Sequence, residues 1–467
     1  MPNSITVGRP TALIIGASAA GLFAAAALSE FADVVIVERD HLPDGPVPRR
    51  GVPQARHAHV IWSGGVLAFN ALLPGLTDEV VARGGRMARI MADMVSRAPN
   101  EVWFRRFLAT HHRNVVCSRD LLDSVMRDRV LDHPRIILRE NTTALALEGN
   151  ASRVTGLRVR TGEEELTLGA DLVVDASGRG SRATQWLIDL GLPKVTDREV
   201  DAGVTYATRL YKAPAGTSNN FPLINVQANP ANPPGQGGIV LPIENNRWLV
   251  TLGGTRGGEP SADPDAYVRF ALGLGDPIIG ELIQNAEPIS DITVTRSTAN
   301  HRRYYEKMKR WPDGFTVLGD AVAAYNPVYG HGLTVAAQGA VALRDILRST
   351  NITAPGTARR LQRATSRPVA AAWDLAVGQD AFYPGATDTP PTAVEKFLAR
   401  FVDRAVATGA RNPRAMGALL DVMSMEKPAT RLFSRDMLLP MLFGPKKQHL
   451  QGPPLTEAEW KAAVQYR

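Results

Sequence analysis

Short apolar runs at the start of the chain alternate with a run of helix-forming residues. Residues 11–16 (TALIIG) are apolar and end in glycine, residues 21–31 (GLFAAAALSEF) favour a helix, and residues 33–38 (DVVIVE) are mostly β-branched. This order predicts a strand, a glycine turn, a helix and a second strand, a βαβ unit with a buried parallel sheet. Near-continuous apolar runs at 171–177 and 314–320 predict two further strands of the same sheet.

The pattern changes between residues 200 and 300. Short aromatic and β-branched segments are separated there by Gly, Pro and Asn, which predicts an inserted antiparallel sheet. The composition of residues 229–238 (NPANPPGQGG) predicts a loop. From about residue 356 onward the pattern is helical.

The length, composition and charge of the chain indicate a globular protein of more than one domain. A chain of 467 residues is long enough for two or three domains, and 44% hydrophobic with 21% charged residues is a globular composition. The 53 basic residues exceed the 46 acidic ones only mildly and form no basic run, so we do not expect nucleic-acid binding. The single cysteine, Cys117, fits a buried structural thiol in a reducing cytoplasm. The uncharged stretch 12–28 is read as a buried strand and helix, so no membrane span is expected.

The first turn reads GASAAG, from Gly16 to Gly21. A dinucleotide fold needs a tight turn at the first glycine, close backbone approach at the position of Ser18, and close helix packing at Gly21. The helix N-terminus then offers free N–H groups to phosphates. Glu38 ends the next strand, where a carboxylate can accept both ribose hydroxyls, which favours FAD or NAD over NADP.

The stretch 317–337 (VLGDAVAAYNPVYGHGLTVAA) decides between these two cofactors. It places one acid, Asp320, at the end of an apolar strand, followed by a Pro-x-x-Gly-x-Gly turn and a helix that starts near Leu333. A carboxylate there can bind the ribityl chain that FAD has and NAD lacks. The glycine turn brings bare backbone against a planar ring, and the helix N-terminus favours the negative charge of a reduced flavin. The pattern therefore indicates FAD.

These motifs resemble a known family. GASAAG with Glu38, residues 171–182 (DLVVDASGRGSR) and the Asp320 stretch resemble the flavoprotein monooxygenases of the para-hydroxybenzoate hydroxylase fold. Residues 49–65, 204–211 and 242–260 resemble, more narrowly, the flavin-dependent epoxidases of polyether-antibiotic biosynthesis, which act on polyene chains in monensin and lasalocid assembly. The resemblance runs from about residue 10 to about residue 390.

The resemblance implies an α/β fold with a discontinuous FAD-binding, Rossmann-like domain of the glutathione reductase type (10–75, 101–195 and 310–350). An antiparallel β-sheet substrate domain (76–100 and 196–309) and a helical C-terminal region (351–467) would complete the chain. The FAD-binding residues implied by the family motifs are Gly16, Ser18, Ala19, Ala20, Gly21, Glu38, Arg39, Arg50, Gly51, Val52, Arg119, Asp320, Pro327, Gly330, His331, Gly332 and Leu333. Trp62, Tyr206 and Tyr325 are candidates for the substrate cavity.

The activity implied is that of a cytoplasmic FAD-dependent monooxygenase of secondary metabolism. It would use dioxygen, through a flavin C4a-hydroperoxide, to epoxidise carbon–carbon double bonds of an apolar polyene or polyketide. Two alternatives stay open: an aromatic hydroxylase or epoxidase of a prenylated aromatic, and a flavin reductase of prenyl lipids. No catalytic base is identified, which favours an alkene over a phenol.

One position departs from the family pattern. The broad family usually has Asp-Gly where this chain has Ser177-Gly178. Because that acid is tied to FAD and pyridine-nucleotide handling, we expect the electrons to come from reduced flavin made by a separate reductase, with NAD(P)H as the other source.

The histidines suggest no metal site from spacing alone. His57 and His59 form an H-x-H with no third ligand at a recognisable distance, whereas a structural zinc site normally has four. The pair His111-His112 is expected in a solvated loop. We therefore predict no metal.

Overall fold

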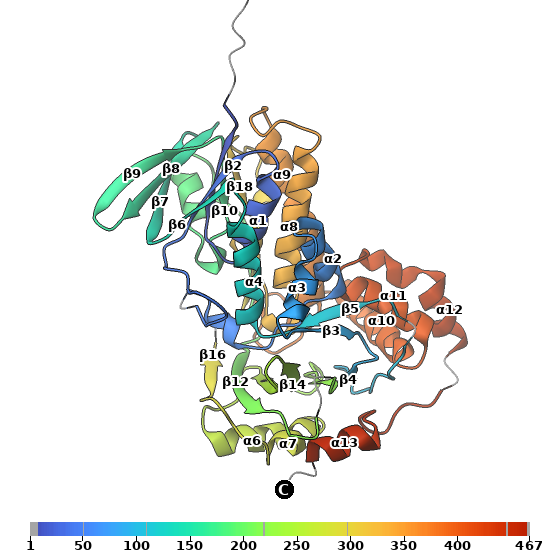
Figure 1. The fold of residues 1–467 in the computed structure, drawn as a ribbon. Helices are drawn as coiled ribbons and strands as arrows, with labels where there is room; N and C mark the ends of the chain where they lie inside the picture. The colour runs from blue at the N-terminus through green and yellow to red at the C-terminus, as the bar shows by residue number, and fades with distance from the viewer. Residues whose placement is uncertain are drawn as a thin grey trace, which may run out of the picture.

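The computed structural model describes residues 8–49, 51–108, 110–217, 220–296, 298–444 and 447–464. Its central element is a parallel five-stranded sheet (Figure 1). In spatial order its strands are β18 (Phe315–Val317), β10 (Leu172–Asp175), β1 (Thr11–Ile15), β2 (Asp33–Val37) and β6 (Ile136–Arg139). The strands predicted at 11–16, 33–38, 171–177 and 314–320 are confirmed.

Both faces of this sheet are buried, as its continuous apolar runs require. Alternate residues such as Ile14 and Val174 pack with α1 (Ala19–Leu28), α2 (Ser63–Leu72), α4 (Arg119–Leu131) and α8 (Gly332–Leu347). The opposite face, with Leu13 and Phe315, packs with α5 (Ala183–Asp189) and α9 (Thr357–Asp380).

The register of the sheet brings distant motifs to one edge. Ile15 pairs with both Val37 and Asp175, and Asp175 pairs with Val317. The residues that follow the four strands therefore emerge side by side at the carboxyl ends, where open α/β sheets bind their ligands.

A second sheet of six strands carries the inserted region. Its order is β16 (Thr293–Thr295), β12 (Thr205–Lys212), β15 (Arg247–Gly254), β14 (Gln236–Ile243), β13 (Leu223–Val226) and β4 (Met94–Arg97). Its pairs are antiparallel except β13 with β4, which confirms the predicted sheet. The loop predicted over 229–238 is wrong at its end, because Gln236 and Gly237 pair with Gly254 and Gly253. Pairing with the neighbouring strand β15 makes these residues part of a strand, although their composition favours a loop.

Three smaller sheets were not predicted. One is an antiparallel β-meander of β7 (Thr142–Gly149), β8 (Val154–Thr161) and β9 (Glu164–Gly169), which lies beside the parallel sheet (Figure 1). The second pairs β3 (Arg86–Arg89) with β5 (Arg113–Val116), and the third joins β11 (Asp197–Val200), β17 (Asn300–Arg303) and β19 (Ala323–Ala324).

The C-terminal region is helical, as expected. After α9 come α10 (Ala393–Gly409), α11 (Pro413–Met423), α12 (Arg435–Phe443) and α13 (Glu457–Val464). α10, α11 and α12 cluster beside the six-stranded sheet and the β3–β5 pair, on the far side of α2 and α3 from the parallel sheet, and α13 returns to the inserted region near α7 (Ile278–Ile283) (Figure 1). Among the described residues no single helix is long and apolar enough to cross a membrane. Only α2 with α3 (Leu76–Ala82), bent by 106° at their junction, passes that test as a pair, on length and composition alone.

Candidate active site

Two turns from distant parts of the chain, at Gly16–Gly21 and at Gly319, touch at the carboxyl edge of the parallel sheet. A Cβ on Gly21 would lie 1.8 Å from the carbonyl oxygen of Gly16, whose φ of +99° favours glycine. A Cβ on Gly319 would lie 2.7 Å from the Cβ of Ala20. No side chain fits at these positions, so backbone N–H groups at the start of α1 stay accessible to a phosphate. Ser18 precedes the helix, and its side chain makes no capping bond.

Glu38 is held at the end of β2 by three hydrogen bonds. Its Oε2 accepts from the backbone N–H of Ala17 at 2.8 Å and from Arg49 at 3.2 Å, and its Oε1 accepts from the N–H of Asp40 at 3.0 Å. Arg49 also donates to the carbonyl of Ala17 at 2.8 Å. Oε1 accepts only one of these bonds, so it keeps a lone pair for a ribose hydroxyl. Arg49 was not predicted as a site residue, although it begins the stretch 49–65 that carries the family resemblance, because no spacing marks its contact with Glu38 across the intervening loop.

The expected site residues on either side of Arg49 differ in their exposure. Arg50 lies outside the described residues. Gly51 approaches Asp40 so closely that a Cβ would lie 2.3 Å from Asp40 Oδ2. Val52 is buried, whereas Arg39 is exposed and 3.7 Å from Asp40.

Asp320 lies in the short 3-10 turn η4 (Gly319–Ala321) and receives no hydrogen bond from any described residue. A Cβ on Gly332, the first residue of α8, would lie 3.8 Å from its Oδ1. Desolvation raises the pKa of Asp320, and the nearby Arg179 and Arg119 partly oppose that shift. A carboxylate without a donor, near two arginines and a helix N-terminus, has the chemistry to accept a hydroxyl hydrogen bond from a ligand.

The two arginines are fixed by the protein. Arg119 is buried at the start of α4, and its Nε donates to Asp123 at 2.6 Å. Arg179 donates to the carbonyls of Tyr325 and Ala299 at 2.6 and 2.8 Å. Arg179 was not predicted as a site residue, although it follows the Ser177-Gly178 pair that the sequence marked as unusual.

The glycine turn after Asp320 lies against Trp62. The indole Nε1 of Trp62 donates to the carbonyl of Tyr329 at 2.9 Å, and a Cβ on Gly330 would lie 3.2 Å from that nitrogen. His331 Nε2 donates to the carbonyl of Met423 at 3.0 Å, which ties the turn to α11. Burial lowers the pKa of His331 to about 4, so its ring is neutral near pH 7. Leu333 is buried in the core of the parallel sheet.

A cavity runs from this turn between the six-stranded sheet and α11. It holds about 1490 Å³ of space not filled by atoms, open solvent at its mouth included. Trp62 and Tyr206, two of the three candidates for a substrate cavity, line it together with Pro327 and Gly330 of the turn. Tyr325 packs in the core instead, where its hydroxyl donates to the carbonyl of Val369. The apolar wall contributed by the C-terminal region was not predicted and consists of Met416, Leu419, Leu420 and Met423.

A buried hydrogen-bond network links the cavity sheet to the glycine turn. The carboxylate of Asp380 accepts from Tyr329 at 2.6 Å, from Asn300 at 2.6 Å and from Asn326 at 2.9 Å. Tyr206 donates to Asn326 Oδ1 at 2.6 Å. Burial, and then the charge of Asp380, holds the pKa of Tyr206 well above its ordinary value, so this phenol stays protonated.

A second chain of hydrogen bonds orients His57. The N–H of Ala58 donates to Thr251 Oγ1 at 3.0 Å, the hydroxyls of Thr251 and Thr208 lie 2.7 Å apart, and Thr208 Oγ1 lies 2.7 Å from His57 Nδ1. If each hydroxyl donates once, Thr208 donates to Nδ1 and the ring proton sits on Nε2. The reverse direction would leave the Thr251 hydroxyl without an acceptor among the described residues. The Nε2 atom of His57 is buried and has no hydrogen-bond partner among the described residues. The side chain of His57 lines the cavity.

Desolvation by burial lowers the pKa of both histidines of the H-x-H. The pKa of His57 falls to about 4 and that of His59 to about 3, with further effects from Arg56 and Arg119 respectively. His59 donates from Nδ1 to the carbonyl of His57 at 2.8 Å. Both rings are therefore neutral near pH 7.

Comparisons with known proteins agree with this geometry. The family model described as an FAD binding domain matches residues 9–377. Protein Rv3254 of Mycobacterium tuberculosis (strain ATCC 25618 / H37Rv) is 32% identical over 430 residues, which cover 85% of this chain and 90% of that protein. The chain therefore belongs to this FAD-binding family, in which flavin-dependent monooxygenases are found, and FAD is its cofactor.

Solved structures show the same fold. The flavin-dependent brominase Bmp2 aligns with a TM-score of 0.66 at 14% identity, over 93% of this chain and 98% of that one. PqsL, a probable FAD-dependent monooxygenase from Pseudomonas aeruginosa, aligns with a TM-score of 0.59 at 19% identity, over 82% of this chain and 100% of that one. At these identities the likeness establishes the FAD-binding fold of the para-hydroxybenzoate hydroxylase type.

Proposed function

We propose that this flavoprotein epoxidises carbon–carbon double bonds of a long, mostly apolar natural-product intermediate, such as a polyene. FAD would lie between Glu38 and the Pro327–Gly330 turn, with Asp320 on its ribityl chain and Arg119 near its middle. When bound and reduced, FAD activates dioxygen and supplies one oxygen atom as an electrophile. The cavity that opens from the turn would bind the substrate and keep water away from the reacting atoms.

The observation that carries the proposal is the absence of a free charge among the described residues that line this cavity. The one lining carboxylate, Asp380, is 2% exposed and accepts three hydrogen bonds. Methionine and leucine side chains of α11 form one wall. A neutral hydrocarbon loses nothing by desolvation here, whereas a charged substrate would find no free counter-charge among these residues.

The same residues disfavour activation of a phenol. Phenol hydroxylation is assisted by a base that removes the phenolic proton. The pKa values of His57 and His331 are lowered to about 4, so both rings are weak bases, and burial keeps Tyr206 and Tyr329 protonated. Epoxidation of an alkene needs no base for the substrate.

The polar end of the substrate would lie at His57. His57 lines the cavity, and its buried Nε2, which the hydrogen-bond chain assigns as the protonated nitrogen, has no partner among the described residues, so it fits an acceptor oxygen such as a carbonyl or hydroxyl. The substrate class is thus an apolar chain with alkene groups and one oxygen acceptor.

A substrate panel tests the proposal. Linear polyenes with a terminal carbonyl, prenylated aromatics and simple phenols are incubated with enzyme, FAD, dioxygen and bromide, and either NAD(P)H or a separate flavin reductase supplies electrons. The proposal expects polyenes to gain one oxygen atom per reacted alkene. Brominated products would point to the activity named for Bmp2, ring-hydroxylated phenols to a hydroxylase, and products that gain two hydrogens to a reductase.

A further inference from the structure

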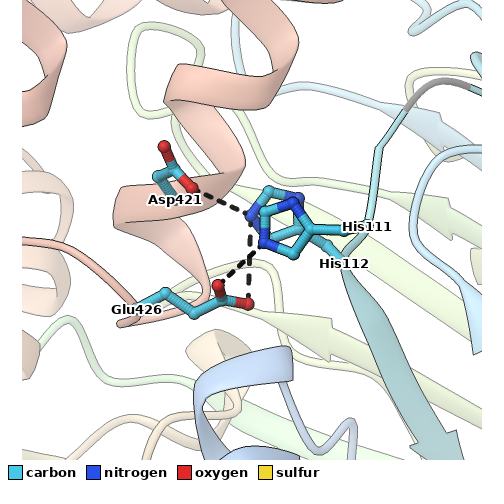
Figure 2. A group of neighbouring side chains, drawn as sticks. All are labelled: His111, His112, Asp421 and Glu426. Atoms are coloured by element: carbon cyan, nitrogen blue, oxygen red, sulfur yellow. Dashed lines mark hydrogen bonds and ion pairs between the residues drawn. The ribbon is translucent and has the colours of Figure 1, made fainter.

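The pair His111-His112 is not the solvated loop that the sequence suggested. His111 is 67% exposed in its side chain, but that of His112 is only 1% exposed. The prediction is wrong for His112 because residues of the C-terminal region, more than 300 positions away, cover it. Figure 2 shows both rings beside Asp421, on α11, and Glu426, just beyond that helix.

The nitrogen and oxygen atoms of these four side chains converge. His112 Nε2 lies 3.3 Å from Asp421 Oδ1 and 3.9 Å from Glu426 Oε1, and His111 Nε2 lies 3.0 Å from Glu426 Oε2. One ligand atom from each of the four lies within 4.8 Å of the other three. Tetrahedral zinc with bonds of 2.0–2.1 Å needs ligand atoms about 3.3 Å apart, which small side-chain shifts here would produce.

The buried histidine is the independent sign of a ligand. Neither ring nitrogen of His112 makes a hydrogen bond of good geometry to any described residue, although the side chain is buried. A buried imidazole without a partner costs about 1–3 kcal/mol. A metal ion bound at Nε2 would remove that cost there.

The surrounding contacts hold the four side chains in place and, among the described residues, leave Asp421 Oδ1 and Glu426 Oε2 with no hydrogen-bond donor from outside the group. Asp421 Oδ2 accepts from Arg431 at 2.7 Å and from Lys427 at 3.1 Å, so Oδ1 remains for a metal. Arg431 also donates a hydrogen bond to the carboxylate of Asp436 at 2.7 Å. Three carboxylates, counting Glu426, thus face two basic side chains, and a divalent cation would offset the excess negative charge. Glu426 is further positioned by a hydrogen bond from Ser63 at the start of α2.

We propose that His111, His112, Asp421 and Glu426 form a structural zinc site. Two imidazole nitrogens and two carboxylate oxygens suit zinc, and four protein ligands leave no open position for chemistry. The site would link the segment before β5 to α11, whose other residues line the substrate cavity. Zinc binding would therefore fix the apolar wall of that cavity, independently of which substrate is oxidised.

The test measures zinc in the full-length flavoprotein, purified without a histidine tag. The protein is stripped with EDTA, dialysed against Zn²⁺ and analysed for metal per chain by mass spectrometry. The proposal expects one zinc per chain in the wild type and less than about one tenth of that in His112→Ala. The exposed His111→Ala, which is not expected to disturb folding, should bind zinc at least about 10-fold more weakly, since loss of supporting contacts alone costs 10–100-fold.

His41→Ala is the matched control, because His41 also pairs with a carboxylate, Glu140, at 2.9 Å but belongs to no group of three or more possible metal ligands among the described residues. It should bind zinc as the wild type does. A folded, yellow wild type that takes up no zinc would overturn the proposal, and so would equal zinc binding in the wild type, His111→Ala and His112→Ala. Retained FAD in all variants separates this result from a failure of the flavin site.

Discussion

The hydroxyl of Tyr206 donates a hydrogen bond to Asn326 Oδ1 at 2.6 Å, although 120 residues separate them. Tyr206 lies on β12 of the cavity sheet, and Asn326 immediately precedes the turn that begins at Pro327. The bond therefore fixes the six-stranded sheet that lines the cavity relative to the turn proposed to lie against the flavin. Positioning of a substrate over a cofactor depends on such rigid links.

Tyr206→Phe should lower the free energy of unfolding by about 0.5–1.5 kcal/mol, the usual value of one hydrogen bond. Tyr383→Phe is the control, because Tyr383 lines the same cavity and its hydroxyl bonds to no described residue. Urea unfolding of both variants measures the difference. Equal losses in the two would show that the bond to Asn326 contributes nothing.

Asp320→Ala should weaken FAD binding by roughly 10–100-fold, because a hydrogen bond to a charged group contributes about 1.5–3 kcal/mol. The variant should still fold, since no described residue donates a hydrogen bond to this carboxylate. Asp345→Ala, at the exposed far end of α8, is the control and should keep its FAD. Flavin fluorescence during titration gives both dissociation constants. Unchanged affinity in Asp320→Ala would remove this residue from the flavin site.

Gly21→Ala should destabilise the first turn, because the new methyl group would lie 1.8 Å from the carbonyl oxygen of Gly16. Overpacking of this kind costs typically about 1–3 kcal/mol, and the displaced helix should also weaken FAD binding. Gly378→Ala on α9 meets no atom within 4 Å and should be neutral or stabilising. Thermal unfolding with and without FAD distinguishes the two. A Gly21→Ala variant as stable as Gly378→Ala would refute the close approach.

Acid should destabilise the protein through its buried histidines. Burial lowers the folded-state pKa of His57 and His331 to about 4 from an ordinary value of 6.5. The two neutral histidines make their full contribution to the free energy of unfolding above pH 6.5. That contribution is lost as the pH falls toward 4, by up to about 3 kcal/mol for each histidine. The raised pKa values of Asp320 and Asp380 act in the opposite direction, with stability lost as the pH rises above 3.8.

Comparison of the wild type with His57→Gln isolates the histidine effect, because both proteins contain the same carboxyl groups. Urea midpoints at pH 7.5 and 4.5 should differ less in the variant than in the wild type. If the two proteins lose the same stability between these pH values, His57 is not held neutral in the folded state.

The sequence predicted the elements whose signals are local. Three features were predicted from neighbouring residues alone: the strand and glycine turn at 11–16, the acid at Glu38 and the Asp320 turn. In each, the residues that determine the local structure lie within a few positions of one another. The sequence also predicted that these strands belong to one sheet, and the parallel register of that sheet places their motifs at one edge.

Contacts between distant residues could not be predicted. Examples are the ion pair of Arg49 with Glu38, the hydrogen bonds that join Asp380, Asn326 and Tyr206, and the burial of His112 beside Asp421. The paired residues are separated by 11 to more than 300 positions in the sequence. Only the fold brings such pairs together, and no periodicity or spacing marks them. The apolar wall on α11 was missed for the same reason, since a helix gives no sign of what its apolar face covers.

The source of the oxygen atom in the product tests the proposed epoxidation most directly. The enzyme, supplied with FAD, electrons and a polyene that it converts, is run under isotope-labelled dioxygen in unlabelled water, and the product is analysed by mass spectrometry and NMR. We expect one labelled oxygen per reacted alkene, bridging the two former alkene carbons. An unlabelled oxygen, a product reduced without oxygen, or label found only on aromatic rings would contradict the proposed epoxidation.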